Sequence, residues 1–276
     1  MSTQSPATPG RVLVIAGSDS GGGAGIQADI KSIMAQGAYA TTAITALTAQ
    51  NTQGVQDIMN VPPAFVARQI SSVLDDIGTD VIKTGMLSQR TMIEQVAETL
   101  MALDLPMVVD PVMVATSGDR LLAEDNIAAL QDLLVNHAFL VTPNLPEASL
   151  LTRRDVDTPD DMKRAADTLM TAGAHAALIK GGHGTGRLVC DLLALQSGFE
   201  MFEHERIDTR NTHGTGCTLA SAIAGQLAGQ ISRDTPPDLK AATERALIYV
   251  HRAIKAAPDL GQGNGPLGHH VPENAS

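Results

Sequence analysis

The residues best suited to chemistry lie late in the sequence, where residues 211–218 read NTHGTGCT and lead into the apolar stretch LASAIAGQLAG. Glycines allow the backbone to turn so that successive N–H groups converge, and the N-terminus of a following helix adds partial positive charge. Gly214, Thr215, Gly216 and Cys217 could therefore hold a phosphoryl group or another oxyanion. An ordinary glycine turn before a helix is the alternative, and the loop alone does not decide between them.

Cys217 stands at the start of this helix, where N–H groups and the helix dipole are expected to lower a thiol pKa and favour a reactive thiolate. A small buried apolar residue is the alternative interpretation, which chemistry alone slightly favours. We expect it for Cys190, which lies in the strand-like run LVCDLLAL. Two cysteines cannot form a disulfide framework, so we expect free thiols in a reducing compartment.

A second group of polar residues follows three short apolar runs. Asp110 follows MVV, Asn144 and Glu147 follow FLV, and Lys180 follows ALI. Ligands of open α/β sheets bind at the carboxyl ends of the strands, so these four residues would meet at one edge. Asp110, Asn144 and Glu147 offer the oxygen ligands that suit a hydrated Mg²⁺. Each residue alone is more typical of a turn or a helix cap, but four together favour a site.

The elements that must position these residues alternate along the chain. We expect strands at 12–16, 41–50, 81–86, 107–112, 139–142 and 176–180, helices at 26–36, 66–77, 93–103, 127–134, 160–172, 218–230 and 239–256, and a hairpin at 188–196 and 199–207. Strands that are apolar throughout and alternate with helices predict a mostly parallel sheet covered on both faces, with the hairpin at its edge. We predict one domain over residues 11–268, a disordered lead-in (1–10) and a flexible tail (269–276).

Composition excludes several classes of function. The chain has 276 residues, a formal charge of −11 and 2% aromatic residues, which argues against a nucleic-acid partner. Its longest uncharged stretches are broken by Thr, Gln, Asn and Gly, so we expect no transmembrane helix. The start MSTQSPATPG lacks the basic and apolar regions of a secretory signal, and we therefore predict a cytoplasmic protein.

An earlier glycine motif raises a different possibility. Residues 23–28 (GAGIQA) fit the dinucleotide pattern G-x-G-x-x-G/A between a strand and a helix. That pattern also expects an acidic residue about 20 positions later, whereas TALTAQNTQGV contains none before Asp57. A Rossmann dehydrogenase is therefore a distant alternative. The Walker pattern is absent, which excludes a P-loop nucleotide site.

Seven segments together resemble one known family, the hydroxymethylpyrimidine/phosphomethylpyrimidine kinases of the ribokinase-like superfamily. They occur in the family's order between about residues 11 and 268, and they read AGSDSGGGAGIQADIKS, ITALTAQNTQGV, KTGML, VVDPVM, TPNLPEA, IKGGHG and NTHGTGCTLASAIA. The resemblance implies a three-layer α/β/α sandwich, usually a homodimer, that uses MgATP. It implies phosphorylation of 4-amino-5-hydroxymethyl-2-methylpyrimidine, and then of its monophosphate to the diphosphate, in thiamine biosynthesis.

The resemblance also implies roles for individual residues. Gln50 would pair with the ring nitrogen and amino group of the pyrimidine, since an amide offers both a donor and an acceptor. The other pocket positions would be Gly17, Asp29, Thr48, Met86 and Val112, with Asp29 orienting polar groups of the substrate.

For the nucleotide, the family pattern implies Lys180 towards the phosphates. It places Asn144, Glu147 and Asp110 in the phosphate and magnesium network, the metal being held by Asp110 and Glu147 through water. The segment 214–217 would form the anion hole for the γ-phosphoryl group. Cys217 occupies the position where many relatives carry an aspartate base, and it could act as base, as positioning group, or as both.

Three alternatives remain open at this stage. A pyridoxal or pyridoxine kinase shares the scaffold and phosphorylates a similar alcohol, although Gln50 favours the pyrimidine. A non-catalytic pyrimidine-binding regulator could share the fold, but it would need neither Lys180 nor the glycine loop. The Rossmann dehydrogenase is the third. We assign no role to His269 and His270.

Overall fold

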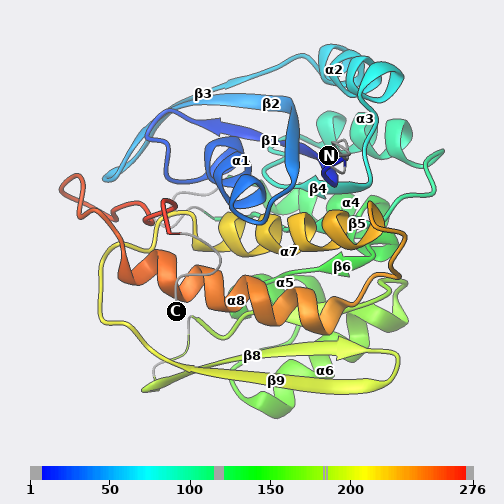
Figure 1. Ribbon diagram of the computed structural model, residues 1–276. Helices are drawn as coiled ribbons and strands as arrows, with labels where there is room; N and C mark the ends of the chain where they lie inside the picture. Colours follow the sequence, from blue (N-terminus) through cyan, green and yellow to red (C-terminus); the bar gives the residue numbers. More distant parts are fainter. Residues whose placement is uncertain (1–7, 115–120, 183, 185, 272–276) are drawn as a thin grey trace, which may run out of the picture.

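The computed structural model describes residues 8–114, 121–182, 184 and 186–271. Within this part of the chain, nine strands form one sheet in the order β3-β2-β1-β4-β5-β6-β7-β8-β9 (Figure 1). Their bounds are β1 Arg11–Asp19, β2 Tyr39–Asn51, β3 Gly54–Asn60, β4 Val81–Thr84, β5 Met107–Val109, β6 Leu140–Val141, β7 Ala177–Ile179, β8 Leu188–Leu195 and β9 Gly198–Glu205. The strands from β2 to β7 pair in parallel, whereas β3, β8 and β9 are antiparallel to their neighbours.

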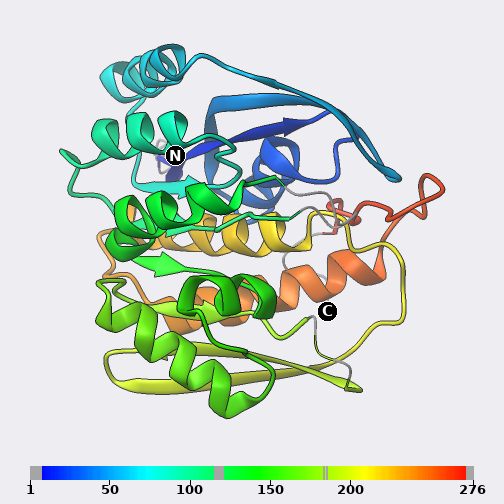
Figure 2. The same cartoon turned by 180° about the vertical axis from the view of Figure 1, so that it is seen from behind.

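Helices cover both faces of the sheet. One face carries α1 (Gly25–Ala35), α7 (Thr215–Ile231) and α8 (Leu239–Lys255), seen in front of the sheet in Figure 1. The other face carries α2 (Pro63–Asp76), α3 (Arg90–Leu100), α4 (Glu124–Leu133), α5 (Leu145–Thr152) and α6 (Pro159–Thr171), which Figure 2 brings to the front, with a short 3₁₀ turn η1 (Val135–His137) after α4. The predicted three-layer α/β/α sandwich is confirmed.

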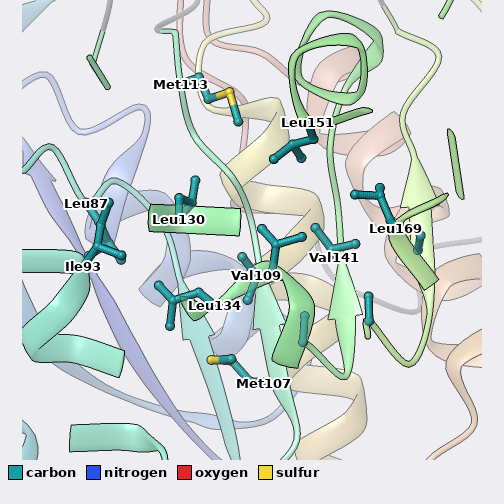
Figure 3. Packing of buried hydrophobic residues seen from close by; sticks show 14 of the residues in the cluster. Leu87, Ile93, Met107, Val109, Met113, Leu130, Leu134, Val141, Leu151 and Leu169 are labelled. Carbon is teal, nitrogen blue, oxygen red and sulfur yellow. The ribbon is translucent and has the colours of Figure 1, made fainter. Parts of the chain in front are cut away.

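Alternation along β1 shows why both faces are apolar. Val12, Val14 and Ala16 pack in the core under α1, α7 and α8, while Leu13 and Ile15 pack in the opposite core. Successive side chains of a strand point to opposite faces, so a strand buried on both sides must be apolar throughout. Figure 3 shows the second core, where side chains from β5 and β6 meet those of α4, α5 and α6.

Most predicted elements are present, and the hairpin of β8 and β9 lies at the sheet edge as expected. Strand β3 was not predicted. Its sequence GVQDIMN is largely exposed and lacks an apolar run, because it pairs with β2 at the opposite edge of the sheet. Helix α7 begins at Thr215, three residues earlier than predicted, after Gly214 adopts a left-handed conformation with φ of 83°.

Both predicted end segments are partly wrong. Gly10 is buried, and its carbonyl oxygen accepts a hydrogen bond of 2.8 Å from the Tyr39 N–H, so the lead-in joins the fold before residue 11. His269 lies 3.0 Å from the Tyr249 hydroxyl through its Nδ1 atom, and Val271 packs against the core. Residues 1–7 and 272–276 lie outside the described residues. Among the helices described, none is long and apolar enough to cross a membrane.

Two adjacent residues of α1 test the packing of this layer. The Ile33 side chain is fully buried, whereas the Met34 side chain is 64% exposed. We expect Ile33→Ala to lower the free energy of unfolding by about 2–5 kcal/mol, since it removes buried methyl groups and leaves a cavity. The matched control Met34→Ala should change it by less than about 0.5 kcal/mol. Urea unfolding at one protein concentration measures both, and equal losses would contradict the assigned burial.

Candidate active site

A cavity of about 710 Å³ opens at the carboxyl ends of the parallel strands. Its walls include the residues that follow β1, β4, β5, β6 and β7, together with the first turn of α7. The structure places nearly every predicted site residue on this wall: Gly17, Thr48, Gln50, Met86, Asp110, Val112, Asn144, Glu147, Lys180, Gly214, Thr215, Gly216 and Cys217. The edge that sheet topology favours for ligands is therefore the edge where the polar residues meet.

Asp29 is the exception, and its predicted role as a substrate contact does not match its position. Its side chain is fully buried, and Oδ1 accepts hydrogen bonds from Lys83 Nζ at 2.8 Å and from Ser221 Oγ at 2.7 Å. It lies outside the residues that line the cavity. Asp29 instead links α1 to β4 and α7 inside the protein. Lys83 was missed, although a lysine inside the apolar run VIKTGML signals a buried partner.

The first turn of α7, residues 214–217, and the Lys180 ammonium group have the geometry of an anion site, which we call the anion cradle. The left-handed Gly214 precedes α7, and a Cβ atom at this position would collide with the carbonyl oxygen of Gly23. Lys180 lies beside the same turn, because a Cβ on Gly216 would be 3.2 Å from Lys180 Nζ. Backbone N–H groups at a helix start and an ammonium group thus converge, which is the arrangement that binds phosphate.

Cys217 does not have the lowered pKa that its helix position predicts. Burial raises the pKa of the Cys217 thiol to about 12, although Lys83 and the hydrogen bond from the Gly25 N–H act in the opposite direction. The loss of hydration therefore outweighs both, and the thiol is neutral at pH 7. Of the two interpretations of Cys217, this favours the buried residue over the reactive thiolate.

Lys180, Asp110 and Glu147 form one charged cluster. Lys180 Nζ lies 3.0 Å from Asp110 Oδ1 and 3.9 Å from Glu147 Oε2. The cluster is positioned by β5, β7 and the start of α5. Burial raises the pKa of Glu147 to about 7, with Lys180 opposing this shift and Asp110 adding to it. Glu147 can therefore gain or lose a proton near neutral pH.

Asn144 and Glu147 also cap a helix, which the sequence offered as the alternative to a role in a binding site. Asn144 Oδ1 accepts from the Glu147 N–H at 2.9 Å, and Glu147 Oε2 accepts from the Asn144 N–H at 2.8 Å. This reciprocal pair is a capping box, which starts α5 at the wall of the cavity. The cap holds the Glu147 carboxylate in place next to Lys180.

A further part of the cavity wall contains a hydrogen-bonded group around Gln50. The carboxylate of Asp19 lies 2.9 Å from His213 Nε2, and the Gln50 amide lies 3.2 Å from the same ring atom. Thr48 Oγ1 is 3.1 Å from Gln50 Oε1. Asp19 and His213 were not predicted; both stand inside segments that carried the family resemblance, but their types alone did not distinguish them.

Asp19 also explains the early glycine motif. Its carboxylate accepts hydrogen bonds from the N–H groups of Gly21, Gly23 and Ala24 at 2.7, 3.0 and 2.8 Å. Burial acts to raise the pKa of Asp19, but His213 and these N–H groups outweigh it and lower the pKa. The N–H groups that would hold a pyrophosphate in a Rossmann site are therefore already bound by Asp19, which argues against the dinucleotide interpretation.

The third region of the cavity combines apolar and imidazole groups from β8, β9 and α8. Leu247, Val250 and Ile254 of α8 line it together with His204 and His251, whose rings meet edge to face at a centroid distance of 5.6 Å. Asp191 lies beneath this region and accepts a hydrogen bond of 2.7 Å from the Gly181 N–H. No pattern in the sequence indicated these residues. Their arrangement offers an apolar slot for a flat ring, adjacent to the anion cradle.

Comparison with known proteins identifies relatives that match almost the full length of the chain. A sequence model described as "Phosphomethylpyrimidine kinase" matches residues 19–268. The hydroxymethylpyrimidine/phosphomethylpyrimidine kinase of Streptomyces coelicolor is 47% identical over 264 residues, which cover 96% of each chain. The thiamine biosynthesis bifunctional protein of Geobacter sulfurreducens is 46% identical over 96% of this chain, which spans about half (53%) of that longer relative.

Among solved structures, the pyridoxal kinase of Bacillus subtilis, determined as an ADP complex, superimposes with a TM-score of 0.85. It is 35% identical and the match covers 95% of this chain and 98% of the other. The scaffold is thus shared with a kinase named for a different substrate.

The protonation of Asp191 gives this region a measurable pH signature. Burial raises the pKa of Asp191 from 3.8 to about 6. Between pH 3.8 and 6 the folded protein therefore keeps a proton on Asp191 that the unfolded chain has lost. The associated stability is complete below about pH 4 and is lost as the pH rises through 6. Asp191→Asn does not ionise and keeps an acceptor for Gly181, so we expect its free energy of unfolding relative to wild type to rise by up to about 3 kcal/mol between pH 4 and 7.

Chemical denaturation across this pH range, without ligands, measures the difference. Asp167→Asn, on the exposed side of α6, is the control and should show no such change. A constant difference between Asp191→Asn and wild type at all pH values would contradict the assignment.

Proposed function

Because the chain belongs to the phosphomethylpyrimidine kinase family, we propose that this cavity binds an aminopyrimidine alcohol beside ATP and transfers the γ-phosphoryl group between them. The acceptors are 4-amino-5-hydroxymethyl-2-methylpyrimidine and its monophosphate, and the product is the diphosphate used in thiamine biosynthesis. The observation that carries this proposal is the anion cradle of α7 with Lys180, which lines the same cavity as the Gln50 region and the apolar slot of α8.

The two regions beside the cradle suit the two substrates. Gln50 presents an amide, which pairs with a ring acceptor and an exocyclic donor. Met86 and Thr48 supply the remaining surfaces there, in a chain with few aromatic residues. The slot between β9 and α8 accepts the adenine ring, and the polyphosphate then extends towards Lys180 and the first turn of α7. The hydroxymethyl oxygen thereby meets the γ-phosphoryl group at the cradle.

Positioning and charge stabilisation account for most of the catalysis in phosphoryl transfer. The N–H groups at the start of α7 and the Lys180 ammonium act on charge that develops on the transferred group. Lys180 keeps its proton for this role: although burial opposes it, Asp110 and Glu147 raise the pKa of Lys180.

The carboxylates suit a magnesium ion. In the described chain, no three His, Cys, Asp or Glu side chains lie close enough to enclose a metal, but Mg²⁺ is commonly held by one or two carboxylates, water and substrate phosphates. Asp110 and Glu147 would hold it through water. Among the described residues, one ammonium group, that of Lys180, pairs with both carboxylates, so the cluster carries no positive excess for a polyphosphate. Bound Mg²⁺ would supply that charge.

The neutral thiol of Cys217 is a positioning group in this scheme rather than the base. We expect Cys217→Ala to keep kcat within about tenfold of wild type, whereas loss of a true general base costs about 10²–10⁴-fold. Cys217→Asp introduces a carboxylate next to Asp110 and should perform no better. ADP release with the pyrimidine alcohol and MgATP measures kcat, and a loss of more than 10²-fold in the Ala variant would restore the base role.

Gln50→Leu keeps the approximate size of the side chain but removes both hydrogen-bonding groups. We expect KM for the pyrimidine to rise by about 10-fold or more, since the polar edge of the substrate is left unpaired, while KM for ATP stays within twofold. An unchanged pyrimidine KM would remove Gln50 from the substrate site. Ser88→Ala, outside the residues that line the cavity, is the control.

The experiment that tests the whole proposal is a coupled ADP-release assay with the pyrimidine alcohol, its monophosphate and pyridoxine. Pyridoxine phosphorylation is the second candidate, favoured by the close superposition on a pyridoxal kinase. A higher kcat/KM for pyridoxine would select it. ADP release with none of the three would instead favour a pyrimidine-binding regulator without kinase activity.

We also infer that the protein acts as a cytoplasmic homodimer. Its exposed apolar side chains include Leu47 and Met59, which are paired across β2 and β3. Light scattering coupled to size-exclusion chromatography measures the oligomeric state directly.

A further inference from the structure

The hydrogen-bond partners of the Gln50 side chain determine which position of its amide holds the oxygen and which holds the nitrogen. The oxygen and nitrogen of a carboxamide are distinguished by their hydrogen-bond partners. In the structure Gln50 Nε2 faces His213 Nε2 at 3.2 Å, and Gln50 Oε1 faces Thr48 Oγ1 at 3.1 Å. The other hydrogen bonds of His213 and of Thr48 show whether each of these two residues donates to Gln50 or accepts from it.

His213 Nε2 must carry a proton. It lies 2.9 Å from Asp19 Oδ2, and that oxygen already accepts the N–H groups of Gly23 and Ala24. An ionised carboxylate only accepts, so the imidazole atom that faces it donates. A donating Nε2 atom cannot also accept from the amide nitrogen of Gln50. The amide atom beside His213 must therefore be the oxygen.

Thr48 leads to the same assignment independently. Its hydroxyl lies 3.0 Å from the carbonyl oxygen of Ser18, which can only accept, so the single hydroxyl proton of Thr48 is used there. Towards Gln50 the Thr48 oxygen can then only accept, which requires the amide nitrogen. Turning the Gln50 amide by 180° lets its N–H donate to Thr48 Oγ1 and brings its oxygen to the single Nε2–H of His213, which Asp19 and Gln50 then share as a three-centre hydrogen bond. The other orientation sets donor against donor at His213.

We propose that His213, held by Asp19, and Thr48, held by the Ser18 carbonyl, lock the Gln50 amide in one orientation and thereby determine which ring substrates are accepted. The lock comprises His213, Asp19, Thr48 and Gln50. His213, Asp19 and Thr48 are positioning residues that act through Gln50. This inference rests on the proposed function, in which Gln50 contacts the ring of the substrate.

A locked amide discriminates between two edges of nearly equal shape. After the bonds to His213 and Thr48, the amide keeps one oxygen lone pair and one N–H for a ligand. A 4-aminopyrimidine offers a ring acceptor beside an amino donor. The 4-oxo analogue offers a ring N–H beside a carbonyl oxygen, so every donor and acceptor is exchanged. A free amide could turn to fit the analogue, whereas a locked one leaves both pairs repulsive.

The test compares kcat/KM for the 4-amino alcohol and its 4-oxo analogue, because their ratio cancels any loss that both substrates share. We expect wild type to favour the amino substrate by at least about 10²-fold. Thr48→Val and His213→Leu should each reduce that ratio by about 10-fold or more. His213→Gln, whose amide can donate to both Asp19 and Gln50, should retain it.

Thr41→Val is the matched control. Thr41 lies on the same strand as Thr48 and is buried, and its hydroxyl donates to the Val12 carbonyl oxygen away from the cavity. We expect the ratio of kcat/KM for the 4-amino and 4-oxo alcohols to be the same in Thr41→Val as in wild type. An unchanged ratio in both Thr48→Val and His213→Leu would overturn the lock.

A second measurement does not depend on the substrate. In ¹⁵N-histidine-labelled protein, the lock requires a proton on Nε2 of His213, seen as a ring N–H signal that is absent from His213→Gln. A ring protonated only at Nδ1 would overturn the proposal whatever the kinetics show. If wild type releases no ADP with the pyrimidine alcohol, the proposed function fails, and the spectrum still decides whether the lock exists.

Discussion

The contact between two glycine segments determines the geometry of the whole site. Gly214 follows the loop of residues 211–213, and a Cβ atom on it would collide with the Gly23 carbonyl oxygen, while a Cβ atom on Gly23 would lie 2.5 Å from the His213 ring. A residue with positive φ at this point lets the chain enter α7 directly against the loop that ends β1. The start of α7 is the anion cradle, and the residue before Gly214 is His213. One backbone contact therefore positions both the first turn of α7 and the His213 ring in the cavity wall.

A buried ion pair supports this arrangement from below. Lys83 and Asp29 are both inaccessible, and the cost of removing two charges from water is several kcal/mol per ion. Ser221, one helical turn after Cys217 on α7, adds a hydrogen bond to Asp29 Oδ1, whereas Asp29 Oδ2 has no hydrogen-bond partner among the described residues. Such a pair adds little net stability over apolar packing, but it accepts only one alignment of β4, α1 and α7. It therefore fixes where the first turn of α7 stands relative to the sheet.

The sequence predicted correctly those structural elements whose residue types usually adopt a single kind of structure. Apolar runs predicted the parallel strands, and glycines before an apolar helix predicted the cradle. The prediction failed where context outweighs type. Strand β3 is polar because it is an exposed edge, and Asp29 lies in a motif of the family yet points into the core. The pKa of Cys217 depends on burial that spacing alone does not reveal.

Histidine shows the same limit at the ring end of the site. The residue type alone does not indicate what His213, a single histidine beside a glycine loop, does. The structure shows its contact with Asp19, which is 194 residues away in the chain. Motifs brought most of the expected pocket residues to the cavity wall, whereas the contact between His213 and Asp19 is formed by segments far apart in the chain. Predicting such a contact requires the fold first.

The acidity of the chain also gains a physical interpretation from the structure. A net charge of −11 suggests repulsion of a nucleotide, but charges spread over a surface are screened within about 8 Å at physiological ionic strength. Phosphate in the cradle would instead meet backbone N–H groups and Lys180 at contact distance, in a partly buried cavity where screening is weak. Local geometry therefore outweighs net charge in binding the nucleotide. The surplus of carboxylates on the surface then affects solubility and the rate of encounter rather than the strength of the final complex.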